Sequence, residues 1–127
     1  MSIHIEASVK TPSINMDENE GSISIKGISI PEDPHEFYYP LLKAIEDYRT
    51  SPAEKTALNL HLEYFNTSST LIIRNLIKDL TEIKEKTDLV VNWYFEQDDE
   101  DMKEAGEEFK MLFSDITFNV TPVDSFY

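Results

Sequence analysis

The sequence contains no cysteine, which excludes disulfide bonds, thiolate metal sites and cysteine nucleophiles. Basic residues are scarce: 11 Lys and Arg stand against 25 Asp and Glu, so the formal net charge is −14. A chain this acidic is poorly suited to nucleic acid or to an anionic membrane surface, since both are bound through Lys and Arg. The charge is instead compatible with a basic partner protein.

Long apolar runs are also missing from the sequence. No stretch approaches the ~20 apolar residues of a membrane helix. The first six residues contain neither a basic region nor an apolar run, so we expect no signal peptide. These absences predict a cytoplasmic protein. The 127 residues, 40% of them hydrophobic, suit a single domain over residues 1–127 with one core.

The first third of the chain alternates apolar and polar residues, as strands do. We expect short strands at residues 3–9, 13–16 and 22–26, with a turn at 17–21. Gly27 shifts the alternation, which indicates a bulge or the end of a strand there. This region therefore predicts an antiparallel hairpin or a small meander.

A helix follows, and its start is marked by capping residues. Asp33 is the expected N-cap, Pro34 suits the first helical position, and Glu36 can complete a capping box. Pro40 interrupts the apolar stripe, because it removes one backbone hydrogen bond and clashes with the preceding turn. We expect a kink at Pro40, or a short turn followed by a helix that begins at Pro40. Residues 50–52 end this helix.

The rest of the chain alternates strands with helices. The apolar spacing predicts strands at 56–64, 89–95 and 116–120, a helix at 67–86, and a second helix that carries its apolar residues between Met102 and Phe113 and ends at 114–115. Consecutive β-α-β units favour parallel strands joined by right-handed crossovers. Polar residues on one side of the first of these strands favour helices mainly on the other face. The predicted fold class is α/β with a mixed sheet: a β-hairpin, a helix, then β-α-β-α-β.

Five single residues carry further expectations. His61 is expected to be a surface strand residue and not a ligand, because no second His or Cys lies near it in the sequence. Trp93 is expected in the core, and Gly106 indicates a close approach between a helix and the sheet. The last residues are expected to form a tail docked through Phe126 and Tyr127.

The junction between the strand at 56–64 and the next helix reads Tyr-Phe-Asn-Thr-Ser-Ser-Thr over residues 64–70. A helix N-terminus exposes unpaired N–H groups and the positive end of the helix dipole. It can therefore hold an anion, including a phosphate formed on a Ser or Thr. The simpler interpretation is that Asn66 or Thr67 only caps the helix. The local pattern leaves both interpretations open.

A run of acids at residues 96–101 offers a second candidate site. Asp98 or Asp99 can cap the next helix. Alternatively, Glu96, Asp98, Asp99 and Asp101 bind Mg²⁺ in a magnesium-dependent enzyme, since Mg²⁺ prefers carboxylate oxygens and water. The run lacks the glycine and spacing of an EF-hand, and the chain has no Walker loop and no G-x-S-x-G elbow. The three histidines fall in separate elements.

Four stretches together resemble the SiaC family of bacterial regulatory phosphoproteins. They are Asn-Thr-Ser-Ser at 66–69, Trp-Tyr-Phe-Glu-Gln-Asp-Asp-Glu-Asp-Met at 93–102, Glu-Ala-Gly-Glu-Glu-Phe at 104–109, and Pro-Glu-Asp at 31–33 before an aromatic-rich helix. The resemblance covers nearly the whole chain. It implies a compact α/β domain similar to the STAS domains of anti-sigma-factor antagonists.

The resemblance also implies a phosphorylation switch. A dedicated Ser/Thr protein kinase phosphorylates the Thr of the Asn-Thr-Ser-Ser motif, here Thr67, and a PPM-type phosphatase reverses the modification. In the best-known system the unphosphorylated protein binds and activates a diguanylate cyclase. The expected function is thus a non-enzymatic switch without a cofactor, in which Thr67 is the acceptor. Loop support is assigned to Asn66, Ser68 and Ser69, and a partner surface to Glu96, Asp98, Asp99 and Asp101.

The two candidate sites are expected to be neighbours. If the strands at 56–64 and 89–95 are parallel, their carboxyl ends lie at one edge of the sheet, where open α/β sheets usually bind ligands. A phosphate on Thr67 would then add about two negative charges beside the acids at 96–101. We therefore expect the unphosphorylated form to bind the effector and the phosphorylated form to release it.

Overall fold

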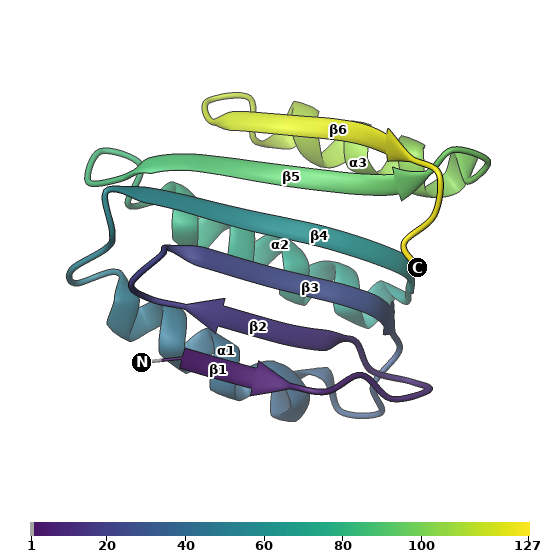
Figure 1. Ribbon diagram of the computed structural model, residues 1–127, viewed down its shortest axis with the longest axis horizontal. Coiled ribbons are helices and arrows are strands. Elements are labelled where there is room, and N and C mark those ends of the chain that lie inside the picture. The colour runs from purple at the N-terminus through teal and green to yellow at the C-terminus, as the bar shows by residue number, and fades with distance from the viewer. Residues whose placement is uncertain (1) are drawn as a thin grey trace.

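A computed structural model describes residues 2–127 and places a six-stranded sheet against three helices, all on one face (Figure 1). The strands are β1 (Ser2–Ile5), β2 (Ser13–Asp17), β3 (Ser22–Ser29), β4 (Lys55–Phe65), β5 (Asp88–Glu96) and β6 (Thr117–Val123). The helices are α1 (Pro34–Tyr48), α2 (Thr67–Thr81) and α3 (Glu100–Leu112).

The strands lie in the sheet in their sequence order, from β1 to β6. The pairs β1–β2 and β2–β3 are antiparallel, whereas β3–β4, β4–β5 and β5–β6 are parallel. The predicted α/β class with a mixed sheet and helices on one face is confirmed. The register between β3 and β4 shifts after Gly27, whose φ is 124°, as the predicted bulge requires, whereas the alternative of a strand end at Gly27 is wrong because β3 continues to Ser29.

Two expectations for the first half of the chain are wrong. The first strand ends at Ile5 and not at residue 9, because residues 8–11 form a turn closed by a hydrogen bond from the Ser8 N–H to the Thr11 carbonyl. Of the two alternatives for the first helix, the start at Pro40 is wrong, because the helix begins at Pro34 and continues through Pro40 to Tyr48. Pro40 removes the helical partner of the Glu36 carbonyl, and both Pro40 and Glu36 are exposed residues.

Two element ends in the second half also differ from prediction. Helix α2 ends at Thr81, and residues 82–86 form turns instead of continuing to Lys86. Ile83 remains buried in these turns, so the apolar spacing continues after the helix has ended. Strand β6 extends to Val123 and not to Val120, since an edge strand tolerates a proline, here at 122.

The core lies between the sheet and the helices, and Trp93 of β5 is fully buried in it, as predicted. The indole N–H of Trp93 donates a hydrogen bond of 2.9 Å to the Met102 carbonyl of α3. A Cβ on Gly106 would lie 2.4 Å from Cδ1 of Trp93. The predicted close approach of this helix to the sheet at Gly106 is therefore confirmed.

The other face of the sheet carries the C-terminal tail. Phe126 is buried there, with its ring edge-to-face on His61 at 5.7 Å, and the Tyr127 hydroxyl donates to Glu63 at 2.7 Å. This confirms the predicted docking of the tail. His61 also stacks on Tyr94 at 4.4 Å, so it is a half-buried strand residue. Burial, followed by the positive charge of Lys26, lowers the pKa of His61.

Within the described residues 2–127, none of the three helices is long and apolar enough to cross a bilayer.

Candidate phosphorylation site and partner surface

Thr67 is the first residue of α2 and is exposed, as predicted for a site that a kinase must reach. Asn66 precedes it in extended conformation, and its side-chain oxygen accepts a 3.0 Å hydrogen bond from the Ser69 N–H. Asn66 is therefore the N-cap, and Thr67 is not needed for that role. Within residues 2–127, the Thr67 side chain forms no hydrogen bond.

The four hydroxyls of the corner have different surroundings. Those of Thr67 and Ser68 belong to exposed residues. Ser69 is fully buried, and its Oγ donates to the Ser29 carbonyl at 3.0 Å. Thr70 Oγ1 donates back to the Asn66 carbonyl at 3.2 Å. Ser69 thus anchors the corner to β3 and is inaccessible to a kinase in the folded protein.

A buried polar network beneath this corner was missed at the sequence level. The Ser29 hydroxyl lies 2.9 Å from the Ser69 hydroxyl and 2.6 Å from the Tyr38 hydroxyl of α1. The Ser29 carbonyl also accepts the Asn66 N–H at 3.2 Å. Burial raises the pKa of Tyr38 to about 12, although its hydrogen bond to Ser29 acts in the opposite direction.

One sequence signal pointed to Ser29. It has the same parity as Ile23 and Ile25, which face the helices, so alternation alone places its side chain inward. The neighbouring isoleucines, Ile28 and Ile30, suggested a change of face instead, but both are only half-buried. The inward-pointing serine is what ties β3 to the start of α2.

The predicted acids are spread along the chain segment that joins β5 to α3. Asp99 is the N-cap of α3, and its side chain accepts the Met102 N–H at 3.1 Å. Glu96 accepts the Phe126 N–H at 3.3 Å, while Asp98 and Asp101 are exposed. Among residues 2–127, no three His, Asp or Glu side chains converge as metal ligands, so this arrangement gives the magnesium hypothesis no support.

The corner and the acidic segment lie at the same edge of the sheet, since β4 and β5 are parallel (Figure 1). Phe65 at the end of β4 packs edge-to-face on Trp93 of β5, with ring centroids 5.9 Å apart. Both following helices thus begin at this edge, as predicted from the strand order.

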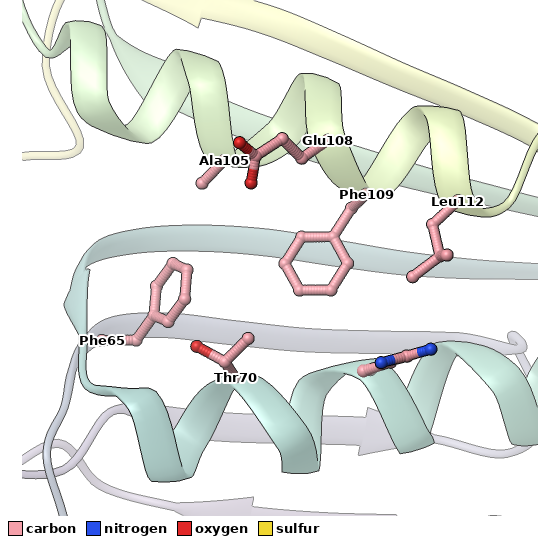
Figure 2. A pocket seen from close by; sticks show the side chains of 7 residues that line it. Phe65, Thr70, Ala105, Glu108, Phe109 and Leu112 are labelled. Carbon is pink, nitrogen blue, oxygen red and sulfur yellow. The ribbon is translucent and has the colours of Figure 1, made fainter.

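An apolar groove runs between α2 and α3 from this edge (Figure 2). It has a volume of about 310 Å³. Its lining residues are Phe65, Thr70, Arg74, Ala105, Glu108, Phe109 and Leu112. Thr70 and Ala105 lie one helical turn beyond Thr67 and Asp101 respectively, so the groove connects the two candidate sites. No pattern in the sequence indicates this groove.

The model of the SiaC family regulatory phosphoproteins matches residues 5–123. The chain belongs to the SiaC family. It is 28% identical, over 109 residues, to an uncharacterised protein of Pseudomonas aeruginosa strain UCBPP-PA14, covering 85% of this chain and 86% of that protein.

Two solved structures from P. aeruginosa are also similar to this SiaC-family chain. One is a crystal structure of the diguanylate cyclase SiaD in complex with its activator SiaC, with a TM-score of 0.89, 26% identity and coverage of 95% of this chain and 99% of that chain. The other is apo-SiaC, with a TM-score of 0.87, 25% identity and coverage of 95% and 98%. The predicted family and fold are thus confirmed.

Proposed function

We propose that this SiaC-family protein is a non-enzymatic signalling protein switched by reversible phosphorylation of Thr67. A cognate Ser/Thr kinase transfers the γ-phosphoryl group of ATP to the Thr67 hydroxyl, which loses its proton, and ADP leaves. A PPM-type phosphatase hydrolyses the ester. The unphosphorylated form binds an effector protein, a diguanylate cyclase as in the SiaC–SiaD complex from P. aeruginosa.

The observation that carries this proposal is the position of Thr67. Thr67 is exposed at the first position of α2. Asn66 caps the helix, and Ser69 anchors the turn to Ser29 of β3. Thr67 is therefore needed neither to cap the helix nor to anchor the turn. A phosphate here faces unpaired backbone N–H groups at the positive end of the helix dipole, so the fold tolerates it.

The same position explains how phosphorylation would alter binding. A phosphate adds about −1.5 to −2 charge and three strong acceptor oxygens. The phosphate charge is added at the edge of the sheet that already carries Glu96, Asp98, Asp99 and Asp101. A partner that fits the small, neutral hydroxyl would meet extra bulk and negative charge, and would dissociate.

The test of the acceptor uses the candidate kinase of the host organism with ATP, followed by intact-mass measurement and peptide mapping. We expect one added phosphate on the wild-type protein and none on Thr67→Ala. Ser68→Ala is the matched control, because Ser68 is the other exposed hydroxyl of the corner. It should be labelled like the wild-type protein. Labelling of Thr67→Ala with loss in Ser68→Ala would move the acceptor to Ser68.

The test of the switch compares effector binding by wild-type protein before and after full phosphorylation. We expect binding of the unphosphorylated form, loss after phosphorylation and recovery after treatment with a PPM-type phosphatase. Stronger binding by the phosphorylated form would refute the proposed direction of the switch. Turnover of generic phosphoesters with Mg²⁺ would refute the assignment as a non-enzyme.

A further inference from the structure

The C-terminal tail, residues 124–127, lies on the face of the sheet that the helices leave open. After β6 ends at Val123 the chain passes the end of β5, and the C-terminus lies beside the end of β4 (Figure 1). Phe126 is buried, with 7% of its area exposed, whereas its neighbours Ser125 and Tyr127 are exposed. Phe126 is therefore the residue that anchors the tail.

Two carboxylates at the carboxyl edge of the sheet hold the tail in place. Glu96, the last residue of β5, accepts the Phe126 N–H at 3.3 Å. Glu63, near the end of β4, accepts the Tyr127 hydroxyl at 2.7 Å. The Lys26 ammonium group lies 4.9 Å from the centroid of the Tyr127 ring. The tail thus connects the ends of the two strands that precede the Thr67 corner and the acidic segment.

His61 of β4 forms the surface on which Phe126 rests. In the sheet His61 lies between Lys26 of β3 and Tyr94 of β5. Its imidazole stacks on the Tyr94 ring, with centroids 4.4 Å apart and an angle of 10° between the planes. The Phe126 ring meets the same imidazole at 5.7 Å and 84°. The imidazole therefore lies between two aromatic rings, with a cation on the neighbouring strand.

This arrangement suits a neutral His61 and not a protonated one. The Nδ1 atom of His61 is buried and has no hydrogen-bond partner within residues 2–127. A neutral imidazole carries a hydrogen on one nitrogen, whereas an imidazolium carries a hydrogen on both. Protonation would therefore leave a charged N–H group buried without an acceptor, which is unfavourable. The new charge would also be repelled by Lys26.

The acids near His61 do not offset this cost. Glu63 and Glu96 already accept hydrogen bonds from the tail, and neither forms an ion pair with His61 within residues 2–127. The acids of the tail itself, Asp124 and the terminal carboxylate, belong to exposed residues, where solvent screens their charge. Stacking on Tyr94 survives protonation, since a cation is attracted to the face of an aromatic ring. Phe126 is thus the group that protonation displaces.

We propose that the C-terminal tail is a pH-sensitive strap, docked on the sheet while His61 is neutral and released when His61 is protonated. Burial, followed by the charge of Lys26, lowers the pKa of His61 from 6.5 in the docked state. Release exposes the imidazole and returns its pKa toward 6.5, so the released state binds a proton more readily. Docking is therefore complete above about pH 6.5 and weakens as the pH falls below that value.

Release of the tail changes the edge of the sheet that carries Thr67. The Glu96 carboxylate loses the Phe126 N–H, and the Glu63 carboxylate loses the Tyr127 hydroxyl. Both carboxylates then become available to a partner at this edge. This consequence for an effector rests on the proposed function above, whereas the release itself does not.

The first experiment is a pH titration of the wild-type protein followed by NMR, from about pH 7.5 to about pH 5.5, where histidines titrate. It records the ring resonances of His61 and the amide resonance of Phe126. We expect the Phe126 amide to move to its position in a disordered chain, with the same midpoint as the His61 ring. The ratio of docked to released tail should fall by up to about tenfold per pH unit. A Phe126 amide that stays in place while His61 titrates would overturn the proposal.

The second experiment tests the reciprocal effect of the tail on His61. Phe126→Ala removes the ring that covers the imidazole, so the pKa of His61 should rise toward 6.5. Ser125→Ala is the matched control, because it shortens an exposed side chain of the same tail and should leave the pKa of His61 as it is in the wild-type protein. An equal pKa of His61 in Phe126→Ala and wild type would refute the coupling between the tail and this histidine.

The third experiment identifies the group that senses the pH. His61→Gln carries an amide that does not titrate, so the Phe126 amide should no longer respond to pH. His35→Gln, at an exposed histidine of α1, should keep the response of the wild-type protein. Release with an unchanged midpoint in His61→Gln would assign the response to another group and overturn the proposal. If His61→Gln undocks the tail at every pH, Phe126→Ala decides, because it leaves His61 in place.

These measurements use neither a kinase nor an effector. A tail that stays docked throughout the titration would therefore refute the strap and leave the Thr67 switch standing. Absence of phosphate on Thr67 after treatment with the kinase would refute the switch, while the titration would still decide on the strap.

Discussion

At the scale of single residues, Asn66 holds the corner at the start of α2. Its side-chain oxygen accepts the Ser69 N–H, and its own N–H donates to the Ser29 carbonyl. We predict that Asn66→Ala lowers the free energy of unfolding by about 0.5–2 kcal/mol, because a helix N-cap is lost. Urea unfolding measures this change. Asn66→Asp should keep the cap, and Thr67→Ala should change stability by less than about 0.5 kcal/mol, as exposed residues usually do. A larger loss in Thr67→Ala would assign Thr67 a structural role.

Tyr38 gives the protein a specific dependence on alkaline pH. Its pKa is raised from 10.0 to about 12 in the folded state, mainly by burial. Between these values the unfolded chain has lost the Tyr38 proton and the folded chain has kept it. The contribution to stability is therefore complete below pH 10 and disappears as the pH rises through about 12. We predict that stability falls less steeply over this range in Tyr38→Phe, by up to about 1.4 kcal/mol per pH unit.

Urea unfolding at several alkaline pH values measures that slope. Tyr39→Phe is the control, because Tyr39 is an exposed neighbour on the same helix, and its slope should equal that of the wild-type protein. Identical slopes for wild type and Tyr38→Phe would mean that the buried hydroxyl ionises as readily as an exposed one.

At the scale of elements, the fit of α3 to the sheet depends on the missing side chain of Gly106. A Cβ at this position would lie 2.4 Å from Cδ1 and 2.7 Å from Nε1 of Trp93, whose ring is fully buried. We predict that Gly106→Ala destabilises the protein by about 1–3 kcal/mol through overpacking, despite the better helix propensity of alanine. Thermal unfolding tests this. Glu107→Ala, an exposed change in the same helix, should have little effect, and an unchanged melting temperature in Gly106→Ala would show that α3 can shift outward freely.

The elements that the sequence predicts best are those whose burial alternates strictly. In β4, Leu58, Leu60 and Leu62 are buried as expected, and parallel pairing with β5 follows from the helix between them. The ends of helices and strands are harder to predict, because residues can remain buried beyond the point where the regular backbone hydrogen bonds stop. Ile83 continues the apolar spacing of α2 within a turn, and Pro40 sits on the exposed side of α1 without ending it.

At the scale of the whole molecule, topology brings the candidate site together. Parallel β4 and β5 send the corner at Thr67 and the acids at 96–101 to one edge, which the strand order alone predicts. The groove between α2 and α3 was not predictable, because it depends on the spacing between two helices packed on different strands. The Ser29 network also escaped prediction, since it joins three elements through hydroxyls that look like surface residues in a sequence.

The edge of the sheet that carries Thr67 is already acidic, because Glu96, Asp98, Asp99 and Asp101 lie at the end of β5 or in the segment that follows it. Phosphorylation adds about −1.5 to −2 to a chain whose net charge is already −14. We predict that Thr67→Glu weakens effector binding, because part of that charge then lies in the contact, and that Asp99→Asn lessens the loss. An asparagine at position 99 can still accept the hydrogen bond from the Met102 N–H and cap α3. The second change therefore removes a charge without removing the N-cap.

Isothermal titration calorimetry of the single and double variants measures these losses. The loss caused by Thr67→Glu should shrink as salt is raised, because the Debye length is only about 8 Å at physiological ionic strength. Glu107→Gln, on the exposed side of α3 that does not line the groove, tests whether any removed acid has the same effect. If genuinely phosphorylated protein binds as tightly as the unmodified form, charge at this edge does not control the partner. If the loss is unchanged by salt, steric bulk at Thr67 is its cause.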